Sequence, residues 1–172
     1  MDIVLIEPQI PQNTGSIARS CAATKTPLHL VGKLGFEISE KNVRRAGLDY
    51  WPHVDLHQHE SWERYLETAK PGKVWVFSKY AKKHYYEAKF SEHDALVFGG
   101  EVKGLGKEFI ARYQDSALLI PIACPAVRSL NLSNAVSIAL YEARRQLGLD
   151  SKLREFSGTP VGSLDSTNDS LA

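Results

Sequence analysis

The chain has 172 residues, 43% of them hydrophobic and 24% charged, which suffices for a folded domain and argues against a disordered protein. Its formal net charge of +1 at pH 7 is close to zero, so a nucleic-acid partner would have to meet a local basic surface. The two cysteines form no CxxC pair, which argues against a disulfide framework and against metal binding through cysteine.

Five short apolar runs predict strands that are buried on both faces of a parallel sheet. They are IVLI at residues 3–6, LHLV at 28–31, VWVF at 74–77, ALVF at 95–98 and ALLIPI at 117–122. Helical patterns follow at residues 15–23, 40–46, 62–69, 107–113 and 130–147. This alternation predicts an α/β fold with a mostly parallel sheet flanked by helices.

Three further segments depart from this alternation. VDLH at residues 54–57 predicts a weaker edge strand, and the imidazoles of HVDLHQH are expected to be exposed on it. Residues 79–92 show neither the helical nor the strand spacing of apolar residues and are long for a connection, which indicates a functional loop. After Gly148 the composition turns to Ser, Asp, Gly and Thr, so we expect one domain over residues 1–149 and a flexible tail over 150–172.

The common signatures of other protein classes are missing from this sequence. MDIVLIEPQ has too short an apolar run for a signal peptide or a membrane span, so we expect a cytoplasmic protein without a membrane partner. The glycine-rich GGEVKGLGK fits neither GxGxxG nor GxxxxGK[ST], and Ser129 has no GxSxG elbow. The histidines form no HExxH pattern, and we expect no metal site.

Two polar clusters directly follow predicted strands. In QNTGSIARS, Asn13 or Thr14 is expected to cap a helix that carries Arg19; a plain cap with a surface arginine explains this segment as well as a ligand site does. In FGGEVKGLG the glycines let the backbone approach a ligand, whose polar groups Glu101 and Lys103 could contact, unless this is a flexible loop with solvated charges. Because ligands bind at the carboxyl ends of such strands, the two loops together favour a shared crevice.

A third cluster opens the long helical segment RSLNLSNAVSIALYEARRQ. With about 3.6 residues per turn, one stripe is apolar and faces the core: Leu132, Val136, Ala139, Leu140, Ala143 and Leu147. Asn131, Asn134 and Tyr141 fall roughly opposite, together with Ala135 and Ile138. Solvated helix faces usually carry Glu and Lys, so this composition favours contact with a substrate or a second subunit, and Ser129 is the expected helix cap.

Basic residues interleave with aromatic ones in SKYAKKHYY, which contains Lys79, Lys82 and Lys83. Lysines reach phosphates and aromatic rings stack on unpaired bases, so the segment suits loop RNA; a charged surface loop is an equal alternative. NVRRAGLDYW adds Arg44 and Arg45 with the same two explanations.

Four separated segments resemble, in this order, the signature motifs of the SpoU-type branch of the SPOUT RNA methyltransferases. They are EPQIPQNTGSIARSCAAT, NVRRAGLDYW, LVFGGEVKGL and IPIACPAVRSLNLSNAVSIALYEARRQLG. Within that branch, the resemblance is closest to the small members that methylate the tRNA wobble nucleotide. It implies a C-terminal trefoil knot, a feature that composition alone would never suggest.

The resemblance also implies a homodimer that binds S-adenosylmethionine and methylates the ribose 2'-hydroxyl of cytidine or uridine 34 in the anticodon stem-loop of tRNA. Carried onto matching positions, the implied cofactor residues are Phe77, Gly99, Ile120, Ser129 and Leu130. The implied catalytic residues are Arg19, Asn131 and Tyr141. Two alternatives stay open: methylation of another tRNA or ribosomal RNA position, and an RNA-binding homologue without catalysis.

Overall fold

The computed structural model describes residues 1–36 and 50–149 of the chain. The helix expected at 40–46, with Arg44 and Arg45, and the tail expected at 150–172 lie outside these described residues. Within them, no helix has both the length and the apolar character that crossing a membrane requires.

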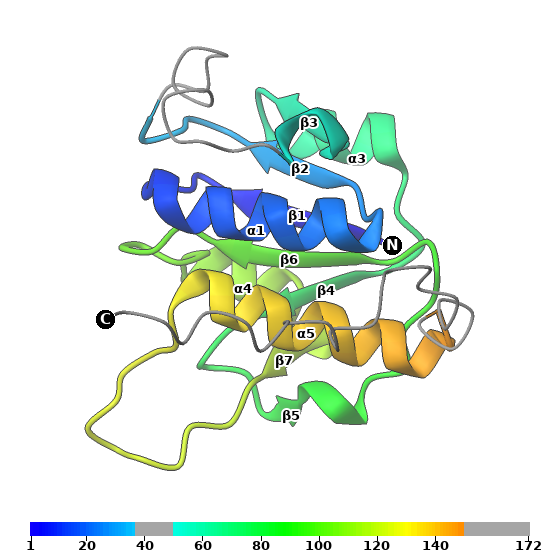
Figure 1. Cartoon of the computed structure of the whole chain (residues 1–172). Coiled ribbons are helices and arrows are strands. Elements are labelled where there is room, and N and C mark those ends of the chain that lie inside the picture. The colour runs from blue at the N-terminus through cyan, green and yellow to red at the C-terminus, as the bar shows by residue number, and fades with distance from the viewer. Residues whose placement is uncertain (37–49, 150–172) are drawn as a thin grey trace, which may run out of the picture.

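A single parallel sheet forms the centre of the fold (Figure 1). Its strands are β1 Asp2–Ile6, β2 Leu28–Val31, β3 Leu56–His59, β4 Val74–Phe77, β5 Lys83–His84, β6 Ala95–Gly99 and β7 Ala117–Leu119. They lie side by side in the order β3-β2-β1-β6-β4-β7-β5, and each neighbouring pair is parallel. The predicted α/β class with a parallel sheet is therefore confirmed.

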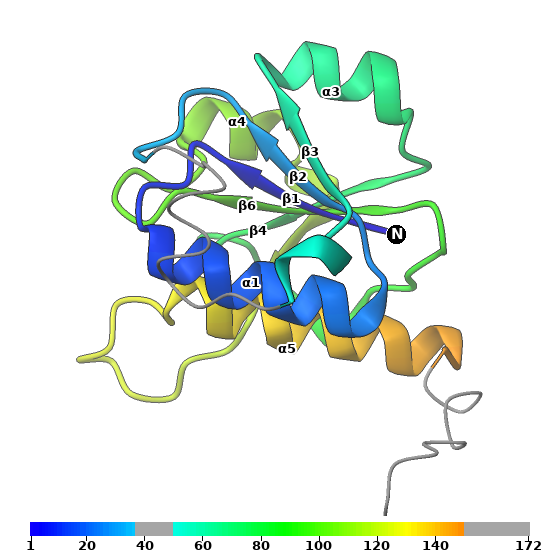
Figure 2. The ribbon, with the colours of Figure 1, turned by 45° about the horizontal axis from the view of Figure 1, so that its top comes forward.

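Within the described residues, four α-helices cover the two faces of this sheet. They are α1 Pro11–Thr24, α3 Trp62–Ala69, α4 Lys107–Arg112 and α5 Leu132–Leu147, and short 3-10 turns lie at η1 Trp51–His53, η2 Tyr85–Glu87 and η3 Gln114–Ser116. Helices α1 and α5 lie together on one face, and α3 and α4 lie on the other (Figure 2). The result is a three-layer arrangement of helices, sheet and helices.

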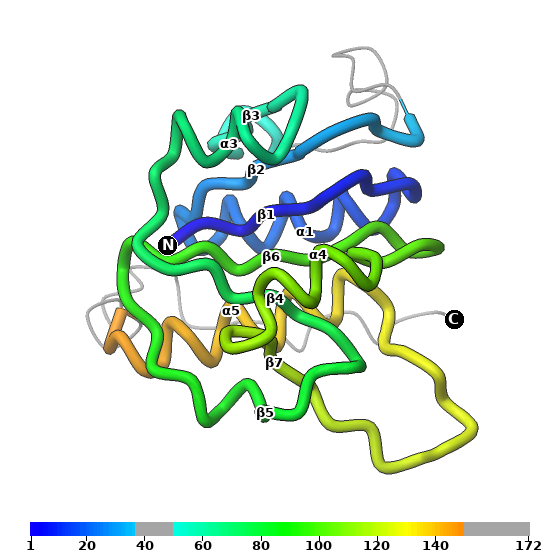
Figure 3. The backbone as a smooth tube through the Cα atoms, turned by 180° about the vertical axis from the view of Figure 1, so that it is seen from behind, coloured from blue at the N-terminus to red at the C-terminus, as the bar shows by residue number. Residues whose placement is uncertain are grey.

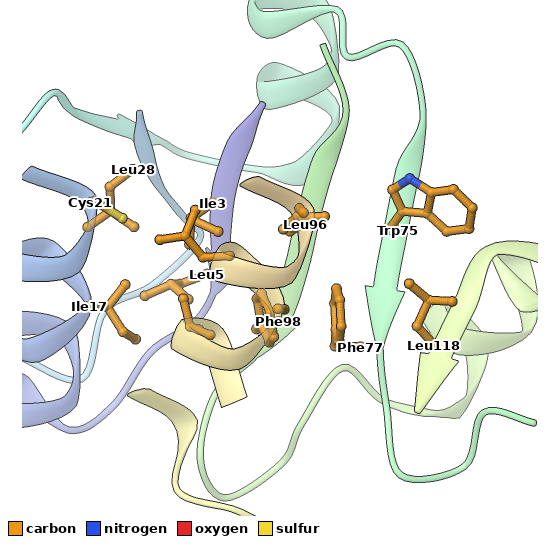
Figure 4. Packing of buried hydrophobic residues seen from close by; sticks show 14 of the residues in the cluster. Ile3, Leu5, Ile17, Cys21, Leu28, Trp75, Phe77, Leu96, Phe98 and Leu118 are labelled. Atoms are coloured by element: carbon orange, nitrogen blue, oxygen red, sulfur yellow. The ribbon is translucent and has the colours of Figure 1, made fainter. Parts of the chain in front are cut away.

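The side chains of β1 show why the sheet needs a helical layer on each face. Alternate residues of a strand point to opposite faces. Ile3 and Leu5 join the core under α1 and α5, whereas Val4 joins the second core under α3 and α4. Figure 4 shows the first core, in which Ile17 and Cys21 of α1 face this side of the sheet.

Helix α5 follows the predicted stripe, since Val136, Ala139, Leu140 and Ala143 are fully buried. One buried residue of α5 was not predicted. Arg144 is 5% exposed, and its guanidinium donates a 2.9 Å hydrogen bond to the carbonyl of Thr24 at the end of α1. A cation at the negative end of a helix dipole is favourable, so this arginine joins the two helices.

The predicted limits of β2, β4 and α3 match the structure, but both predicted caps were wrong. Pro11, whose fixed φ suits the first helical position, starts α1 earlier than expected, so neither Asn13 nor Thr14 is its cap and both are buried inside the first turn. Asn131, not Ser129, caps α5 and accepts from the Ser133 backbone N–H at 2.8 Å. The expected strand at 54–57 is β3, two residues later, and the expected loop at 79–92 contributes the edge strand β5.

Because all the strands are parallel, their carboxyl ends meet at one edge of the sheet. Figure 3 shows the turns after β1 and β6 on the same side of the sheet, and the long connection from β7 approaches α5 from that side. Polar residues that follow different strands are thereby brought together.

Candidate functional site

A pocket of about 700 Å³ lies at this edge of the sheet. Its walls come from the loops after β1, β4, β6 and β7 and from the start of α5. The crevice predicted between the first and third of these loops is therefore present. Such a position, beyond the carboxyl ends of strands in an open α/β sheet, is the usual place for a ligand.

All five residues that the sequence assigned to a cofactor line this pocket: Phe77, Gly99, Ile120, Ser129 and Leu130. The Phe77 ring is 9% exposed and stacks on Phe98 with 4.6 Å between centroids, which gives the pocket a rigid aromatic floor. Ser129 is exposed and Leu130 half-buried on the irregular segment that precedes α5. The structure brings the five positions together, and their role stays a prediction.

Two consecutive glycines, the last residue of β6 and the first of the loop that follows, let this loop close tightly. A Cβ on Gly100 would stand 2.2 Å from the carbonyl oxygen of Glu7, and one on Gly99 would stand 2.2 Å from the carbonyl carbon of Gly104. The Gly104 N–H donates to the Gly100 carbonyl at 2.8 Å. Any larger side chain would push this loop away from β1, so the glycines fix the wall of the pocket.

Three side chains form a continuous hydrogen-bonded chain along the pocket, which we call the polar chain: Glu101, Asn13 and Asn131. The Asn13 amide donates to Glu101 Oε1 at 2.8 Å, and the Asn131 amide donates to Asn13 Oδ1 at 2.9 Å. All three residues line the pocket. The polar chain thus joins the first turn of α1, the loop after β6 and the start of α5.

Glu101 does not have the free carboxylate that a ligand contact would need. Besides the Asn13 amide, it accepts from the backbone N–H groups of Gln9 at 2.8 Å and Ile10 at 3.3 Å. Burial raises the pKa of this carboxyl, but the hydrogen bonds from these donors outweigh burial and lower it below its ordinary value. Glu101 is therefore ionised and bound within the protein, whereas Lys103 beside it is exposed at the pocket.

The other two predicted catalytic residues, Arg19 and Tyr141, are not among the residues that line the pocket. Arg19 is exposed on α1, and its guanidinium lies 4.6 Å from the ring centroid of Tyr50. The Tyr50 hydroxyl in turn donates to the Gly15 carbonyl at 2.8 Å. Tyr141 is 49% exposed on α5, on the face that also shows Ile138, as the helical pattern predicted.

The predicted basic residues described by the structure are all exposed: Lys79, Lys82 and Lys83. Lys79 and Tyr80 line the pocket, and the Lys79 ammonium lies 5.2 Å from the Tyr80 ring centroid. Lys83 belongs to the edge strand β5. Exposed lysines therefore lie both at the pocket and on the edge strand of the sheet.

Sequence reasoning missed several residues of this site. Leu105, Ile110 and Ile122 line the pocket as apolar residues on loops and on α4, where nothing in their local pattern distinguishes them. Asn13 was assigned to a helix cap instead of the polar chain. Its position, like that of Glu101, just beyond the end of a predicted strand was the available signal, because adjacent parallel strands bring such residues together.

Histidines gather elsewhere, at the β2 and β3 edge of the sheet. His29 packs against His57 and His59 with centroid distances of 4.7 and 5.2 Å, and His29 Nδ1 lies 2.9 Å from His59 Nε2. His59 is half-buried, so the expectation of exposed imidazoles holds only in part. Among residues 1–36 and 50–149, no group of three or more His, Cys, Asp or Glu side chains could hold a metal ion.

Comparison with known proteins gives consistent results. The model of the family described as "SpoU rRNA Methylase family" matches residues 1–141. A protein of Saccharophagus degradans named "tRNA (cytidine(34)-2'-O)-methyltransferase" is 45% identical over 148 residues, covering 86% of this chain and 96% of that protein.

Two solved structures extend this similarity to the fold. One, described as "Structural insights into the 2-OH methylation of C/U34 on tRNA", is 50% identical with a TM-score of 0.79 and covers 86% of this chain and 95% of that chain. An AdoMet-bound rRNA methyltransferase from Sinorhizobium meliloti is 27% identical with a TM-score of 0.69 and covers 84% of this chain and 56% of that chain. By the family match and by these identities, the chain belongs to the SpoU rRNA methylase family.

Proposed function

We propose that this protein transfers a methyl group from S-adenosylmethionine to the ribose 2'-hydroxyl of nucleotide 34, cytidine or uridine, in the anticodon stem-loop of tRNA. The observation that carries the proposal is the pocket, which unites the five expected cofactor positions and has Asn131 in its wall. The relatives that match this chain over nearly their whole length are named for this reaction.

The residues of the pocket fit S-adenosylmethionine. A volume of about 700 Å³ lies within the range of small-molecule sites, about 300–1,000 Å³. Ile120, Ile122 and Leu130 offer apolar surface for an adenine ring. Ser129 and the lysines at positions 79 and 103 offer hydroxyl and ammonium groups for the polar ends of the molecule. When bound, this cofactor supplies an electrophilic methyl group on a sulfonium.

The chain's own residues have to position the ribose and help its hydroxyl lose a proton. An in-line displacement requires the 2'-oxygen about 3 Å from the methyl carbon, so positioning accounts for much of the rate. Asn131 binds the ribose at the pocket, and Tyr141 helps to hold it. Arg19 polarises the hydroxyl or a neighbouring phosphate. Because arginine stays protonated in proteins, a phosphate or solvent takes the proton.

The exposed positions of Arg19 and Tyr141 support a homodimer. Neither residue lines the pocket of its own chain, so a second copy packed on the outer faces of α1 and α5 would bring them to a pocket. Ile138 and Tyr141 are exposed on α5 and suit this contact, whereas Ala135, expected on the same face, packs against the core and lines the pocket. The family resemblance adds a C-terminal trefoil knot around the pocket, and the sequence composition adds one catalytic domain over residues 1–149 and action in the cytoplasm.

Two copies would also double the basic surface available to tRNA. Lys79, Lys82 and Lys83 bind phosphates beside the pocket, and Arg44 and Arg45 are further candidates from the sequence. Tyr80, 69% exposed at the pocket, is suited to stacking on an unpaired base of the anticodon loop.

Nucleoside mass spectrometry of tRNA from cells with and without the gene tests this function. We expect 2'-O-methylation at position 34 to disappear from the tRNAs of the deleted strain and to return with the wild-type gene. Loss of a methyl group at another tRNA position or in ribosomal RNA would support the alternative substrate. Unchanged modification, together with tight RNA binding, would support a homologue without catalysis.

A further inference from the structure

Helix α1 begins without a capping side chain of its own. Its N-cap residue, Ile10, makes no side-chain cap, and its first turn contains no acidic residue. The Glu101 carboxylate from the distant loop after β6 lies at this position instead and accepts from the Gln9 and Ile10 N–H groups. Negative charge at the start of a helix is favourable, so Glu101 completes α1 from outside.

The direction of the hydrogen bonds in the polar chain follows from this carboxylate. An ionised carboxylate only accepts, so Asn13 must turn its amide nitrogen toward Glu101 and its oxygen toward Asn131. Asn131 must then donate to Asn13 and turn its own oxygen toward α5. There the oxygen accepts from the backbone N–H groups of Ser133 at 2.8 Å and Asn134 at 3.4 Å.

We propose that Glu101 is a positioning residue that fixes, through Asn13, the orientation of the Asn131 amide at the pocket. The inference deepens the proposed methyl transfer and rests on it, because Asn131 is there assigned to the ribose. Glu101 is bound to protein groups on both carboxylate oxygens, so its contribution to the reaction passes through Asn131.

The substitution Glu101→Gln tests the direction of these bonds with little change of size. A glutamine can accept from Asn13 with its oxygen, but its NH2 group then faces the Gln9 N–H, and two donors oppose each other. If the glutamine turns over, its NH2 group opposes the Asn13 amide and the orientation of Asn13 and Asn131 is lost. Either arrangement leaves a partly buried donor without an acceptor.

The first measurement is a double-mutant cycle on methyl transfer at saturating tRNA and cofactor. We expect Glu101→Gln to lower kcat about 10-fold in the wild-type background and less than about 2-fold in the Asn131→Ala background. Equal losses in the two backgrounds, or no loss in the wild type, would overturn the proposal. Glu108→Gln, an exposed glutamate of α4, is the matched control and should leave kcat unchanged.

The second measurement needs neither tRNA nor cofactor, so its outcome separates this inference from the proposed function. In ¹⁵N NMR spectra, Glu101→Gln should shift the side-chain NH2 resonances of Asn13 and Asn131 and speed hydrogen exchange at the Gln9 amide. Glu108→Gln should do neither. If the spectra around Asn131 are unchanged by Glu101→Gln, the positioning role is wrong even where the wild-type protein methylates tRNA.

A second variant keeps the test decisive if Glu101→Gln fails to fold. Asn13→Leu removes the link between Glu101 and Asn131 but leaves the Glu101 carboxylate on the Gln9 and Ile10 N–H groups. Thermal unfolding establishes that the variant is folded. We expect the same loss of kcat and the same shift of the Asn131 resonance, and a folded Asn13→Leu protein with normal kcat would contradict the inference.

Discussion

Two polar clusters lie at different strands of the sheet, and their surroundings differ. The polar chain of Glu101, Asn13 and Asn131 borders an open pocket of about 700 Å³. The histidine cluster of His29, His57 and His59 packs ring on ring on β2 and β3, with His29 only 6% exposed. Of the two clusters, only the polar chain borders a space that can receive a ligand.

The comparison shows that a concentration of polar side chains does not by itself indicate a site. In the histidine cluster, Asp2 of β1 lies 3.6 Å from His29 Nε2, and Tyr65 of α3 donates to Asp2 at 3.4 Å, so its groups satisfy one another. Substitutions at the pocket should therefore change catalysis, whereas substitutions among the histidines should change stability. The following predictions test that separation, from the largest expected effect to the smallest.

The largest effect is expected from Arg19→Ala. Loss of a cation near the reacting hydroxyl should lower kcat at saturating tRNA about 100-fold or more, in the range found when a single group that stabilises charge is removed. Thermal unfolding should change little because Arg19 is exposed. Arg112→Ala, on the exposed side of α4, is the control and should keep its rate. A full methylation rate in Arg19→Ala would refute the assigned role.

Gly100→Ala should damage the pocket through the backbone. The added Cβ would stand 2.2 Å from the Glu7 carbonyl oxygen, so the loop must move, at a cost of about 1–3 kcal/mol. We expect calorimetric titration to show weaker S-adenosylmethionine binding by about 10-fold. At Gly72 a Cβ would meet its nearest atoms at 3.6 Å, so Gly72→Ala should bind normally. Equal affinities of the two variants would contradict the claim that Gly100 fixes the wall of the pocket.

The histidine cluster should make stability depend on pH. Burial, and next the neighbouring His57 and His59, lower the pKa of His29 from 6.5 to about 4. The folded state therefore binds fewer protons than the unfolded state between these values, so stability is complete above pH 6.5 and falls as pH drops toward 4. After allowance for solvent screening we expect a loss of about 2 kcal/mol in urea unfolding.

The substitution His29→Gln tests whether His29 causes this pH dependence. It should flatten the change of unfolding free energy between pH 6.5 and 4 and leave the rate of methyl transfer at pH 7.5 within about 2-fold of wild type. His53→Gln, an exposed histidine outside the cluster, should keep the wild-type slope. If His29→Gln abolished methyl transfer in a folded protein, the histidine cluster would belong to the functional site after all.

The smallest effect is expected from the double substitution Lys82→Glu with Lys83→Glu. Removing two phosphate contacts should weaken tRNA binding severalfold and reduce the slope of log K against log salt by about 1–2. Filter binding over a range of potassium chloride concentrations measures both. Arg112→Glu is the control. It also reverses a positive charge, but at a residue that does not line the pocket of about 700 Å³, and it should leave the slope unchanged. An unchanged slope in the lysine variant would show that β5 is not part of the RNA-binding surface.

The parts of the fold that depend on local pattern were predictable. LHLV and VWVF are buried strands because every residue is apolar or shielded, and their limits match the structure. The two-residue strand β5 has no pattern to detect and exists because β7 offers it a parallel neighbour. Arg144 carries a charge next to an apolar stripe, and the packing of α5 on the end of α1 brings the Thr24 carbonyl to it as an acceptor.

The sequence predicted which residues belong to the site better than it predicted the contacts between them. The family resemblance named six of the residues that line the pocket, the five cofactor positions and Asn131, but the bond between Asn13 and Glu101 joins positions 88 residues apart. That bond depends on the register of β1 beside β6, in which Ile6 pairs with Gly99. Local rules assigned Asn13 to a cap because they could not include the partner that the sheet brings to it.

Methyl transfer to a chosen ribose is the most direct test of the function. Purified protein and S-adenosylmethionine would be incubated with two anticodon stem-loops that differ only in a hydroxyl or a hydrogen at the 2' position of nucleotide 34, and the products analysed by mass spectrometry. We predict one methyl group on the ribose of nucleotide 34 in the first RNA and none in the second. Methylation of the 2'-deoxy RNA, or of neither, would contradict the account.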